Sequence, residues 1–228
     1  MAGYGSRTPR TSVLRMRLAL IGTGNVGRAL AKGWAAAGHE VVLGSRDPAA
    51  KAVLASELGA PVVTVADAAA QADVIVNVTP GTESVALLRT VSAELRGKVL
   101  LDIAVGFTEE PHGVALSHPT VSLGEEIQEA LPDTRVVKTL STVDAIVMTG
   151  PADLTGPSTV FLSGNDAEAK KTTAALLTDL GWPESAQLDL GPIETARGQE
   201  HFALLFMGIA GALGSYDFGI QVVPHRGN

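Results

Sequence analysis

The chain has 228 residues, which is enough to bury a full core as one large domain or as one domain with a smaller lobe. Hydrophobic residues make up 46% and charged residues 18%, which excludes an intrinsically disordered chain. A net charge of −7 and the lack of a basic cluster argue against nucleic acid or an anionic membrane as partners. The chain has no cysteine, which excludes disulfides and thiolate chemistry and is typical of a reducing compartment, so we expect a cytoplasmic protein.

Residues 1–15 contain Gly, Ser, Thr, Pro and three Arg but no apolar run, so they do not form a secretory signal. We expect a disordered tail here. Met16 directly precedes the first predicted strand and is a candidate natural start.

A glycine-rich turn, Gly-Thr-Gly-Asn-Val-Gly at 22–27, joins a predicted strand at 17–21 to a predicted helix at 25–37. This order is what a dinucleotide-binding βαβ unit needs. Gly22 permits the tight turn, Gly24 lets a pyrophosphate approach the backbone, and Gly27 lets the helix lie close to the sheet. The helix N-terminus offers free N–H groups to the phosphates.

The second predicted strand, at 40–44, is followed by Ser45 and Arg46, about 18 residues after Gly27. An NAD-binding unit usually has an acidic residue here, which would repel a 2′-phosphate. A guanidinium can bind that phosphate through charge-assisted hydrogen bonds, with the serine hydroxyl as a further donor. Lys51 adds a cation or is simply solvated. The pattern predicts NADP(H) rather than NAD(H); an ordinary surface turn is the alternative.

The next strands are predicted at 62–65, 74–78 and 99–102, with helical segments at 48–58, 67–72 and 82–94. Thr79 and Pro80 follow the fourth strand and are expected to line the middle of the cofactor, although a simple strand-ending turn is the alternative. The segment from Ala104 to Gly106 is small, so a flat nicotinamide ring could lie against it.

In the second half we expect a loop at 108–121, a helix that begins with a capping box at Ser122, and a strand at 135–140. A long site-forming loop at 141–158 precedes strands at 160–163 and 187–190, with a helix from Asp166 between them. The last helix, 194–213, is apolar around its whole circumference. The longest apolar stretch of the chain, 202–214, is too short to span a bilayer. The helix predicts a homodimer; burial within one chain is the alternative.

Alternating strands and helices at this spacing predict an α/β Rossmann fold, a doubly wound and mainly parallel sheet with a smaller C-terminal lobe. We assign residues 16–140 to the NADP-binding domain. Residues 141–228 are expected to form the lobe that carries the acceptor site and the dimerisation helix.

The sequence contains no convincing catalytic or metal constellation. Its five histidines are scattered, and neither a Gly-x-Ser-x-Gly elbow nor a Tyr-x-x-x-Lys pair occurs. We therefore predict no metal and assign no catalytic residue; His112 and His118 are candidates for substrate contact only. Hydride transfer between two organic cofactors needs mainly alignment, whereas carbonyl reduction needs a proton donor.

From Met16 onward the chain resembles the deazaflavin (coenzyme F420)-dependent NADP oxidoreductase family. The residues that carry the resemblance are Ile-Gly-Thr-Gly-Asn-Val-Gly at 21–27, Gly-His-Glu-Val-Val-Leu-Gly-Ser-Arg at 38–46, Gly-Asn-Asp-Ala-Glu-Ala-Lys at 164–170, Leu-Asp-Leu-Gly-Pro-Ile at 188–193, Ala196 and Arg197, and the end from 211 to 220.

The resemblance implies a Rossmann domain with a smaller C-terminal lobe, a homodimer, and a deazaflavin or other flat acceptor stacked near the nicotinamide. It implies NADPH contacts from Thr23, Asn25, Val26, Ser45 and Arg46. Deazaflavin-using members typically carry a histidine after the strand that ends near residue 140, and this chain has none there. Similar domains reduce flavin as the cytosolic part of membrane metalloreductases.

The leading hypothesis is an NADP(H)-dependent oxidoreductase that transfers hydride between NADPH and a deazaflavin (F420) or flavin acceptor. One alternative is an NADPH-dependent reductase of a small imine or ketone. The other is a non-catalytic NADP(H)-binding sensor module, because a fold alone does not settle function.

Overall fold

The structure is a computed structural model that describes residues 14–111 and 113–225. Residues 1–13 of the predicted tail lie outside the described residues, and so does His112. Within the described part, Arg15 forms an ion pair with Glu40 at 2.9 Å.

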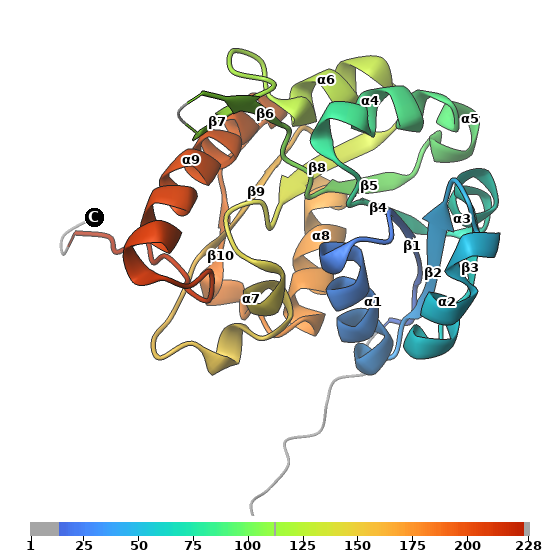
Figure 1. Ribbon diagram of the computed structural model, residues 1–228, viewed down its shortest axis with the longest axis horizontal. Helices are drawn as coiled ribbons and strands as arrows, with labels where there is room; N and C mark the ends of the chain where they lie inside the picture. The colour runs from blue at the N-terminus through green and yellow to red at the C-terminus, as the bar shows by residue number, and fades with distance from the viewer. Residues whose placement is uncertain (1–13, 112, 226–228) are drawn as a thin grey trace, which may run out of the picture.

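Eight strands form one twisted sheet in the order β10-β9-β8-β5-β4-β1-β2-β3 (Figure 1). All neighbouring pairs are parallel except β8 and β9. Six neighbouring strands of this sheet, β8-β5-β4-β1-β2-β3, have the doubly wound order of a Rossmann fold. The predicted fold class is therefore confirmed. The strands of the sheet are β1 (Arg17–Ile21), β2 (Glu40–Ser45), β3 (Val62–Thr64), β4 (Val74–Asn77), β5 (Val99–Asp102), β8 (Arg135–Thr139), β9 (Val160–Gly164) and β10 (Gln187–Asp189).

Helices connect these strands. They are α1 (Asn25–Ala37), α2 (Ala52–Leu58), α3 (Val65–Gln71), α4 (Gly81–Arg89), α5 (Ser92–Leu95), α6 (Leu123–Ala130), α7 (Ala145–Thr149), α8 (Ala167–Asp179) and α9 (Ala196–Leu213), with 3-10 turns η1 (Ala49–Lys51), η2 (Pro151–Asp153), η3 (Glu184–Ala186) and η4 (Ile193–Thr195). Within the described residues, none of these helices is long and apolar enough to cross a membrane.

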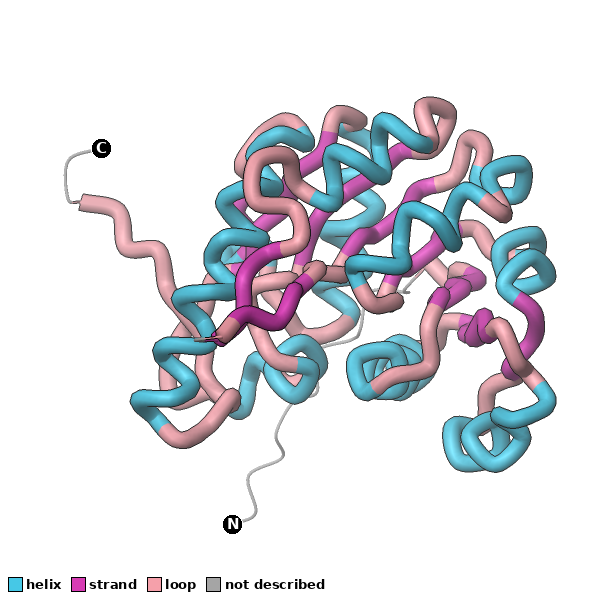
Figure 2. The backbone as a smooth tube through the Cα atoms, turned by 45° about the horizontal axis from the view of Figure 1, so that its top comes forward, coloured by secondary structure: helices cyan, strands magenta, loops and turns pink. Residues whose placement is uncertain are grey.

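The helices cover both faces of the sheet, and the strands form the middle layer in Figure 2. Successive residues of a strand point to opposite faces. Leu18 and Leu20 of β1 therefore belong to the buried cluster that includes residues of α1, α7 and α8, whereas Ala19 and Ile21 belong to the one that includes residues of α3, α4, α5 and α6. Burial on both faces explains why these strands read as continuous apolar runs.

Several predicted boundaries are confirmed. Strand β1 and helix α1 have the predicted limits, and α1 ends at Gly38 in the left-handed conformation with φ 105°. The capping box at Ser122 is present. The third strand stops one residue early, because the Thr64 hydroxyl accepts a hydrogen bond from the Asp67 amide and caps α3.

Two predicted loops contain regular structure. Residues 108–121 were expected to be a loop but form an antiparallel hairpin, β6 (Phe107–Glu110) with β7 (Gly113–Leu116). All four residues of β6 are exposed, so its sequence has no alternation that would reveal a strand. The predicted loop at 141–158 contains α7 and η2, and Asp144 caps α7 through its side chain.

The last helix is not buried within one chain. Its apolar side chains Leu204, Leu205, Met207 and Leu213 are 40%, 59%, 41% and 62% exposed. Helix α9 stands at one side of the molecule (Figure 1). The alternative of burial inside a single chain is therefore wrong. The division of the chain at residue 140 stays a prediction, and β9 and β10 continue the sheet beyond that residue.

Candidate functional site

The glycine turn has the close backbone approaches that its spacing predicts. Gly22 has φ 124°, and a Cβ on it would lie 2.6 Å from the Val78 carbonyl oxygen. A Cβ on Gly27 would lie 2.7 Å from the carbonyl oxygen of Gly22. Only glycine therefore lets β1, β4 and α1 meet here. A Cβ on Gly24 would meet no atom within 4 Å, so space is open beside this residue.

The N-terminus of α1 faces that open space. Its N-cap is Gly24, which has no side chain to accept the first amide hydrogens. Asn25 is exposed, Thr23 and Val26 are half-buried, and the Thr23 carbonyl accepts a hydrogen bond from Arg28 Nε at 3.1 Å. Uncapped amides and the positive end of the helix dipole suit an anion such as a pyrophosphate.

Strand β2 ends beside the turn, and its corner carries the predicted cationic group. Ser45 is buried, and its Oγ accepts a hydrogen bond from the Asp47 amide at 3.1 Å, which leaves the hydroxyl proton available for a phosphate. Arg46 is exposed and forms an ion pair with Glu83 of α4 at 2.7 Å. Lys51 follows in η1. A 2′-phosphate at this corner would replace the Glu83 carboxylate as the partner of Arg46.

The segments after β4 and β5 touch each other. A Cβ on Gly81 would lie 2.3 Å from the Gly106 amide nitrogen, so the turn that contains Thr79 and Pro80 is packed against Ala104–Gly106. The Thr79 hydroxyl points into the protein, with Asn77 Oδ1 at 2.7 Å. Any contact of this turn with a cofactor would therefore involve its backbone or methyl group rather than the hydroxyl.

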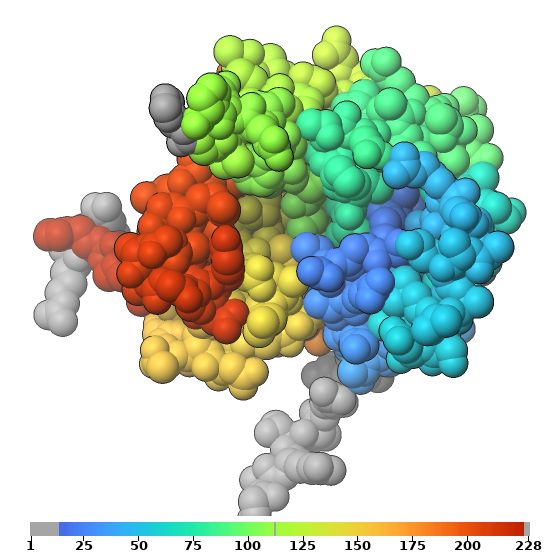
Figure 3. Space-filling view, in the orientation of Figure 1, coloured from blue at the N-terminus to red at the C-terminus, as the bar shows by residue number. Residues whose placement is uncertain are grey.

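These segments surround one hollow. In the space-filling view the surface is recessed between the blue residues that lead into α1, the green residues around the β5 end, and the red helix α9 (Figure 3). Strands β1, β2, β4 and β5 are parallel, so their carboxyl ends lie at the same edge of the sheet. The structure thus brings the predicted site residues to one edge; cofactor contact by each of them stays a prediction.

A buried polar network that the sequence analysis missed supports this edge. Lys138 of β8 is fully buried, and its Nζ lies 2.9 Å from Asp102 Oδ2 and 2.8 Å from Glu200 Oε1. It also donates a hydrogen bond to the carbonyl of Ala104. Asn77 Nδ2 donates to Asp102 Oδ1 at 2.8 Å. The network therefore ties the ends of β4, β5 and β8 to one another and to α9.

Glu200 joins this network to α6. Its carboxylate accepts hydrogen bonds from the amides of Leu123 and Gly124, at 2.9 and 3.1 Å, in the first turn of that helix. Burial raises the pKa of Asp102. Burial alone would lower the pKa of Lys138, but the charges of Asp102 and Glu200 outweigh it and raise the pKa, so the ammonium stays protonated.

A sequence signal for the network existed. Asn77, Asp102 and Lys138 are polar residues at or near the carboxyl ends of otherwise apolar strands. A charged residue inside a buried strand needs a partner. Which residue is the partner depends on strand order, which the sequence alone did not provide.

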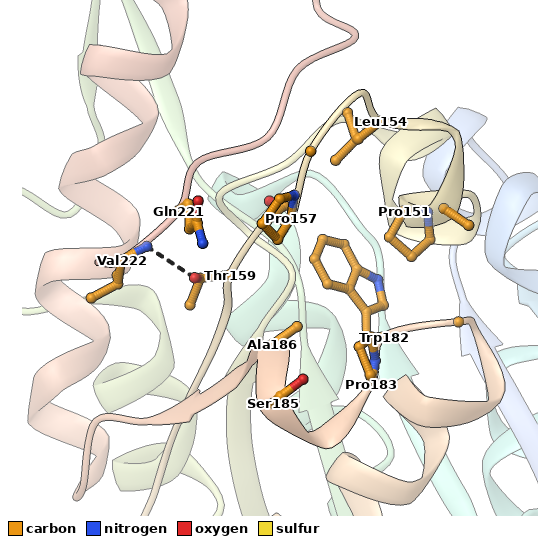
Figure 4. A pocket seen from close by; sticks show the side chains of 14 residues that line it. Pro151, Leu154, Pro157, Thr159, Trp182, Pro183, Ser185, Ala186, Gln221 and Val222 are labelled. Carbon is orange, nitrogen blue, oxygen red and sulfur yellow. Dashed lines mark hydrogen bonds between the residues drawn. The ribbon is translucent and has the colours of Figure 1, made fainter. Parts of the chain in front are cut away.

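A separate cavity lies near the C-terminal segment (Figure 4). Its volume is about 410 Å³. Pro151, Leu154, Trp182 and Val222 line it, and Trp182 Nε1 donates to the Met148 carbonyl at 3.0 Å. Of the described residues that line it, none carries a charge and none is a predicted site residue. It therefore offers no cationic side chain for a phosphate.

No three His, Asp or Glu side chains within residues 14–111 and 113–225 are grouped so that they could hold a metal ion. His39 has a structural role, because its Nε2 lies 3.0 Å from Asp179 and its Nδ1 accepts the Met16 amide.

Comparison with known proteins identifies the family. The family model described as NADP oxidoreductase, coenzyme F420-dependent, matches residues 17–106. The crystal structure of a proposed F420-dependent NADP reductase from Arthrobacter sp. FB24 is 40% identical in sequence and has a TM-score of 0.85. The match covers 92% of this chain and 100% of that one. The chain belongs to the coenzyme F420-dependent NADP oxidoreductase family. It is an NADP-dependent oxidoreductase.

Two further relatives of this F420-dependent NADP oxidoreductase family member show how far the likeness extends. The F420-dependent NADP reductase of Methanothermobacter marburgensis is 29% identical over 212 residues, which are 85% of this chain and 92% of that one. The metalloreductase STEAP3 of Rattus norvegicus is 29% identical over 189 residues, which are 82% of this chain. Those residues are 36% of STEAP3, so the chain spans about a third of that protein's length.

Proposed function

We propose that this family member binds NADP(H) along the carboxyl edge of its sheet. The turn before α1 binds the pyrophosphate, the corner after β2 binds the 2′-phosphate, and the segments after β4 and β5 line the nicotinamide half. The residues assigned to these three parts are Gly22, Thr23, Gly24, Asn25, Val26 and Gly27; Ser45, Arg46 and Lys51; and Thr79, Pro80, Ala104 and Gly106.

The observation that carries the proposal is the pair of anion-binding features at this edge. The uncapped N-terminus of α1 opens onto free space at Gly24, and the residue that follows Ser45 is an arginine rather than an acid. The guanidinium of Arg46 is 71% exposed and so can reach a ligand. The family's dependence on NADP supports the same assignment.

We propose a deazaflavin (F420) or a flavin as the hydride acceptor. Bound NADPH supplies the hydride, and the protein holds the donor carbon and the accepting ring atom about 3–3.5 Å apart. The contact of Gly81 with Gly106 fixes the backbone against which the nicotinamide would lie. The names of the relatives from Methanothermobacter and Arthrobacter support F420 as the acceptor.

The cofactor assignment is tested with Arg46→Ala. Hydrogen bonds to charged groups contribute about 1.5–3 kcal/mol, so NADPH should bind about 10–100-fold more weakly while the affinity for NADH is unchanged. Arg89→Ala, which removes an exposed arginine from the end of α4, is the matched control and should change neither affinity. An unchanged preference for NADPH in Arg46→Ala would reject the assignment.

The acceptor is tested by following NADPH oxidation with F420, FMN, FAD and small carbonyl and imine compounds. We expect turnover with F420 or a flavin. Turnover only with an imine or ketone would establish the alternative reductase function. Tight NADPH binding without any turnover would instead establish a sensor module.

We further propose a homodimer in which a second copy covers α9. Four apolar side chains of this helix are 40% or more exposed, and an apolar patch of this kind marks an interaction surface. Phe206 stacks on Phe218 with ring centroids 4.7 Å apart, so the segment after the helix is held against it. Leu205→Glu should convert the dimer to a monomer in sedimentation at micromolar concentration. Val53 of α2 is also apolar and exposed, so Val53→Glu should leave the protein a dimer. A monomeric wild type would reject the proposal.

A further inference from the structure

A hydroxyl, an imidazole and a carboxylate form a hydrogen-bonded chain beside the proposed nicotinamide site. Ser117 Oγ lies 2.7 Å from His118 Nδ1, and His118 Nε2 lies 3.3 Å from Glu126 Oε2. The imidazole is 13% exposed and the Glu126 side chain is 41% exposed. The chain therefore runs from a partly buried hydroxyl to a carboxylate in contact with solvent.

Two elements hold this chain in place. Ser117 and His118 directly follow β7, the strand that was expected to be loop. Glu126 lies in the first turns of α6, whose capping box at Ser122 fixes where the helix begins. The position of the hairpin against α6 thus sets the distance between His118 and Glu126.

The hydroxyl end of the chain lies on the proposed nicotinamide segment. The Ser117 amide donates a hydrogen bond to the Gly106 carbonyl at 2.9 Å. A Cβ on Gly106 would lie 2.0 Å from Ser117 Oγ and 3.1 Å from His118 Nδ1. The Ser117 hydroxyl therefore occupies the space where a side chain of residue 106 would stand.

The arrangement has the form that a proton donor needs. In the neutral ring, Nε2–H donates to Glu126 while Nδ1 accepts from the Ser117 hydroxyl; in the imidazolium form both nitrogens donate. A hydroxyl that is hydrogen-bonded to an imidazole, itself oriented by a carboxylate, can lose a proton to a substrate and regain one from the ring.

We propose that Ser117, His118 and Glu126 form a proton relay that serves the hydride acceptor. The proposal rests on the proposed function and narrows the acceptor to a compound that takes up a hydride on one atom and a proton on a nitrogen or oxygen. A conjugated ring meets this requirement: a deazaflavin takes the hydride on a ring carbon, a flavin takes it on a ring nitrogen, and each takes the proton on another ring nitrogen.

The proton and electron balance is complete. The acceptor gains two electrons with the hydride and is reduced, while NADPH loses them and is oxidised. The Ser117 O–H bond breaks as its proton moves to the acceptor, and the His118 imidazolium returns a proton through Nδ1. The neutral ring keeps its proton on Nε2 and regains the second one at Nδ1 through Ser117, whose hydroxyl takes a proton from water after the reduced acceptor has left. Glu126 is a positioning residue, because it holds Nε2 and touches neither reactant.

The kinetic test compares wild type with Ser117→Ala, Ser117→Thr and His118→Gln, using F420 or FMN as the acceptor. Loss of general acid catalysis typically lowers the rate by about 10²–10⁴-fold, so kcat should fall at least about 100-fold in Ser117→Ala and His118→Gln. The dissociation constant for NADPH, read from its fluorescence, should stay within about twofold, because no cofactor phosphate contacts these residues in the proposal. Ser117→Thr keeps the hydroxyl and should retain most of kcat. His201→Gln, an exposed histidine of α9, is the matched control.

A second readout needs no turnover. Nitrogen-15 chemical shifts of the His118 ring in the cofactor-free protein report which nitrogen carries the proton. The relay predicts a proton on Nε2 and a bare Nδ1 in the neutral ring. A neutral ring with its proton on Nδ1 and a bare Nε2 would overturn the relay, because Nε2 could then not donate to Glu126 and the carboxylate would not orient the ring.

The outcomes separate the relay from the proposed function. Wild-type kcat in Ser117→Ala and His118→Gln would overturn the relay and leave the NADPH reductase standing. Covalent labelling of Ser117 by a fluorophosphonate would assign the chain to acyl chemistry and likewise overturn the relay. A wild type that neither binds NADPH nor reduces F420 or flavin would overturn the proposed function, and the relay with it.

Discussion

Replacing Lys138 by methionine tests the buried network most severely. The ammonium is held between Asp102 and Glu200 at 2.9 and 2.8 Å, and all three side chains are 2% exposed or less. Lys138→Met keeps most of the volume but leaves two carboxylates facing each other without a cation. Removal of one partner from a buried pair costs about 3–5 kcal/mol, because the remaining charge has no compensation.

The assay is urea unfolding followed by circular dichroism. With an m-value of about 3 kcal/mol/M, a loss of about 3–5 kcal/mol lowers the unfolding midpoint by about 1–2 M. Lys171→Met is the matched control, because Lys171 is exposed and paired with the exposed Glu168, and its midpoint should not change.

The effect should depend on pH with a defined sign. Burial raises the pKa of Asp102, and loss of Lys138 removes the main interaction that opposes this rise. A carboxyl whose pKa is higher in the folded than in the unfolded protein stabilises the fold below its unfolded pKa and loses that contribution as the pH rises. Lys138→Met should therefore be closest to wild type in acid and furthest from it at about pH 8. Equal destabilisation by Lys138→Met and Lys171→Met, or no pH dependence, would refute the reasoning.

The remaining predictions concern the site edge and its supports. Glu83→Gln should tighten NADPH binding by up to about fivefold in a fluorescence titration, because it removes the carboxylate that competes for Arg46; weaker binding would contradict this. Hydrogen bonds from Arg197, and further ones from Ser122, lower the pKa of Glu125 from 4.5 to about 2, so its contacts stabilise the fold above pH 4.5 and lose their effect as the pH falls to about 2. The difference in thermal midpoint between wild type and Arg197→Gln should accordingly be largest near neutral pH and vanish near pH 2. A difference that does not change with pH would contradict a stabilising role of the Arg197–Glu125 ion pair. Gly81→Ala should lower kcat, since its Cβ would lie 2.3 Å from backbone and displace the proposed nicotinamide segment; a crystal structure with that segment unmoved would contradict the reasoning.

The N-terminal half of the fold could be predicted from the sequence because its signals are local. Glycine spacing, apolar runs and the stop at Gly38 set β1 and α1 within neighbouring residues. The corner at Ser45 and Arg46 could be found in the same way, since its distance from the turn is fixed by one helix and one strand.

The rest depends on contacts between distant parts of the chain. The exposed hairpin β6–β7 has no alternating pattern, so its pairing could not be recognised. Lys138, Asp102 and Glu200 lie on three elements that only the tertiary fold brings together. The chain from His118 to Glu126 was missed for the same reason: the histidine was noticed, but its partners depend on how the hairpin meets α6.

The edge formed by the glycine turn and Arg46 is the proposed binding site of the phosphorylated cofactor. The most direct measurement is the dissociation constant of the wild-type protein for NADPH and for NADH, titrated in the same buffer. The 2′-phosphate contacts predict that NADPH binds at least about 10-fold more tightly. Equal affinity for the two, or tighter binding of NADH, would show that Arg46 does not bind a 2′-phosphate.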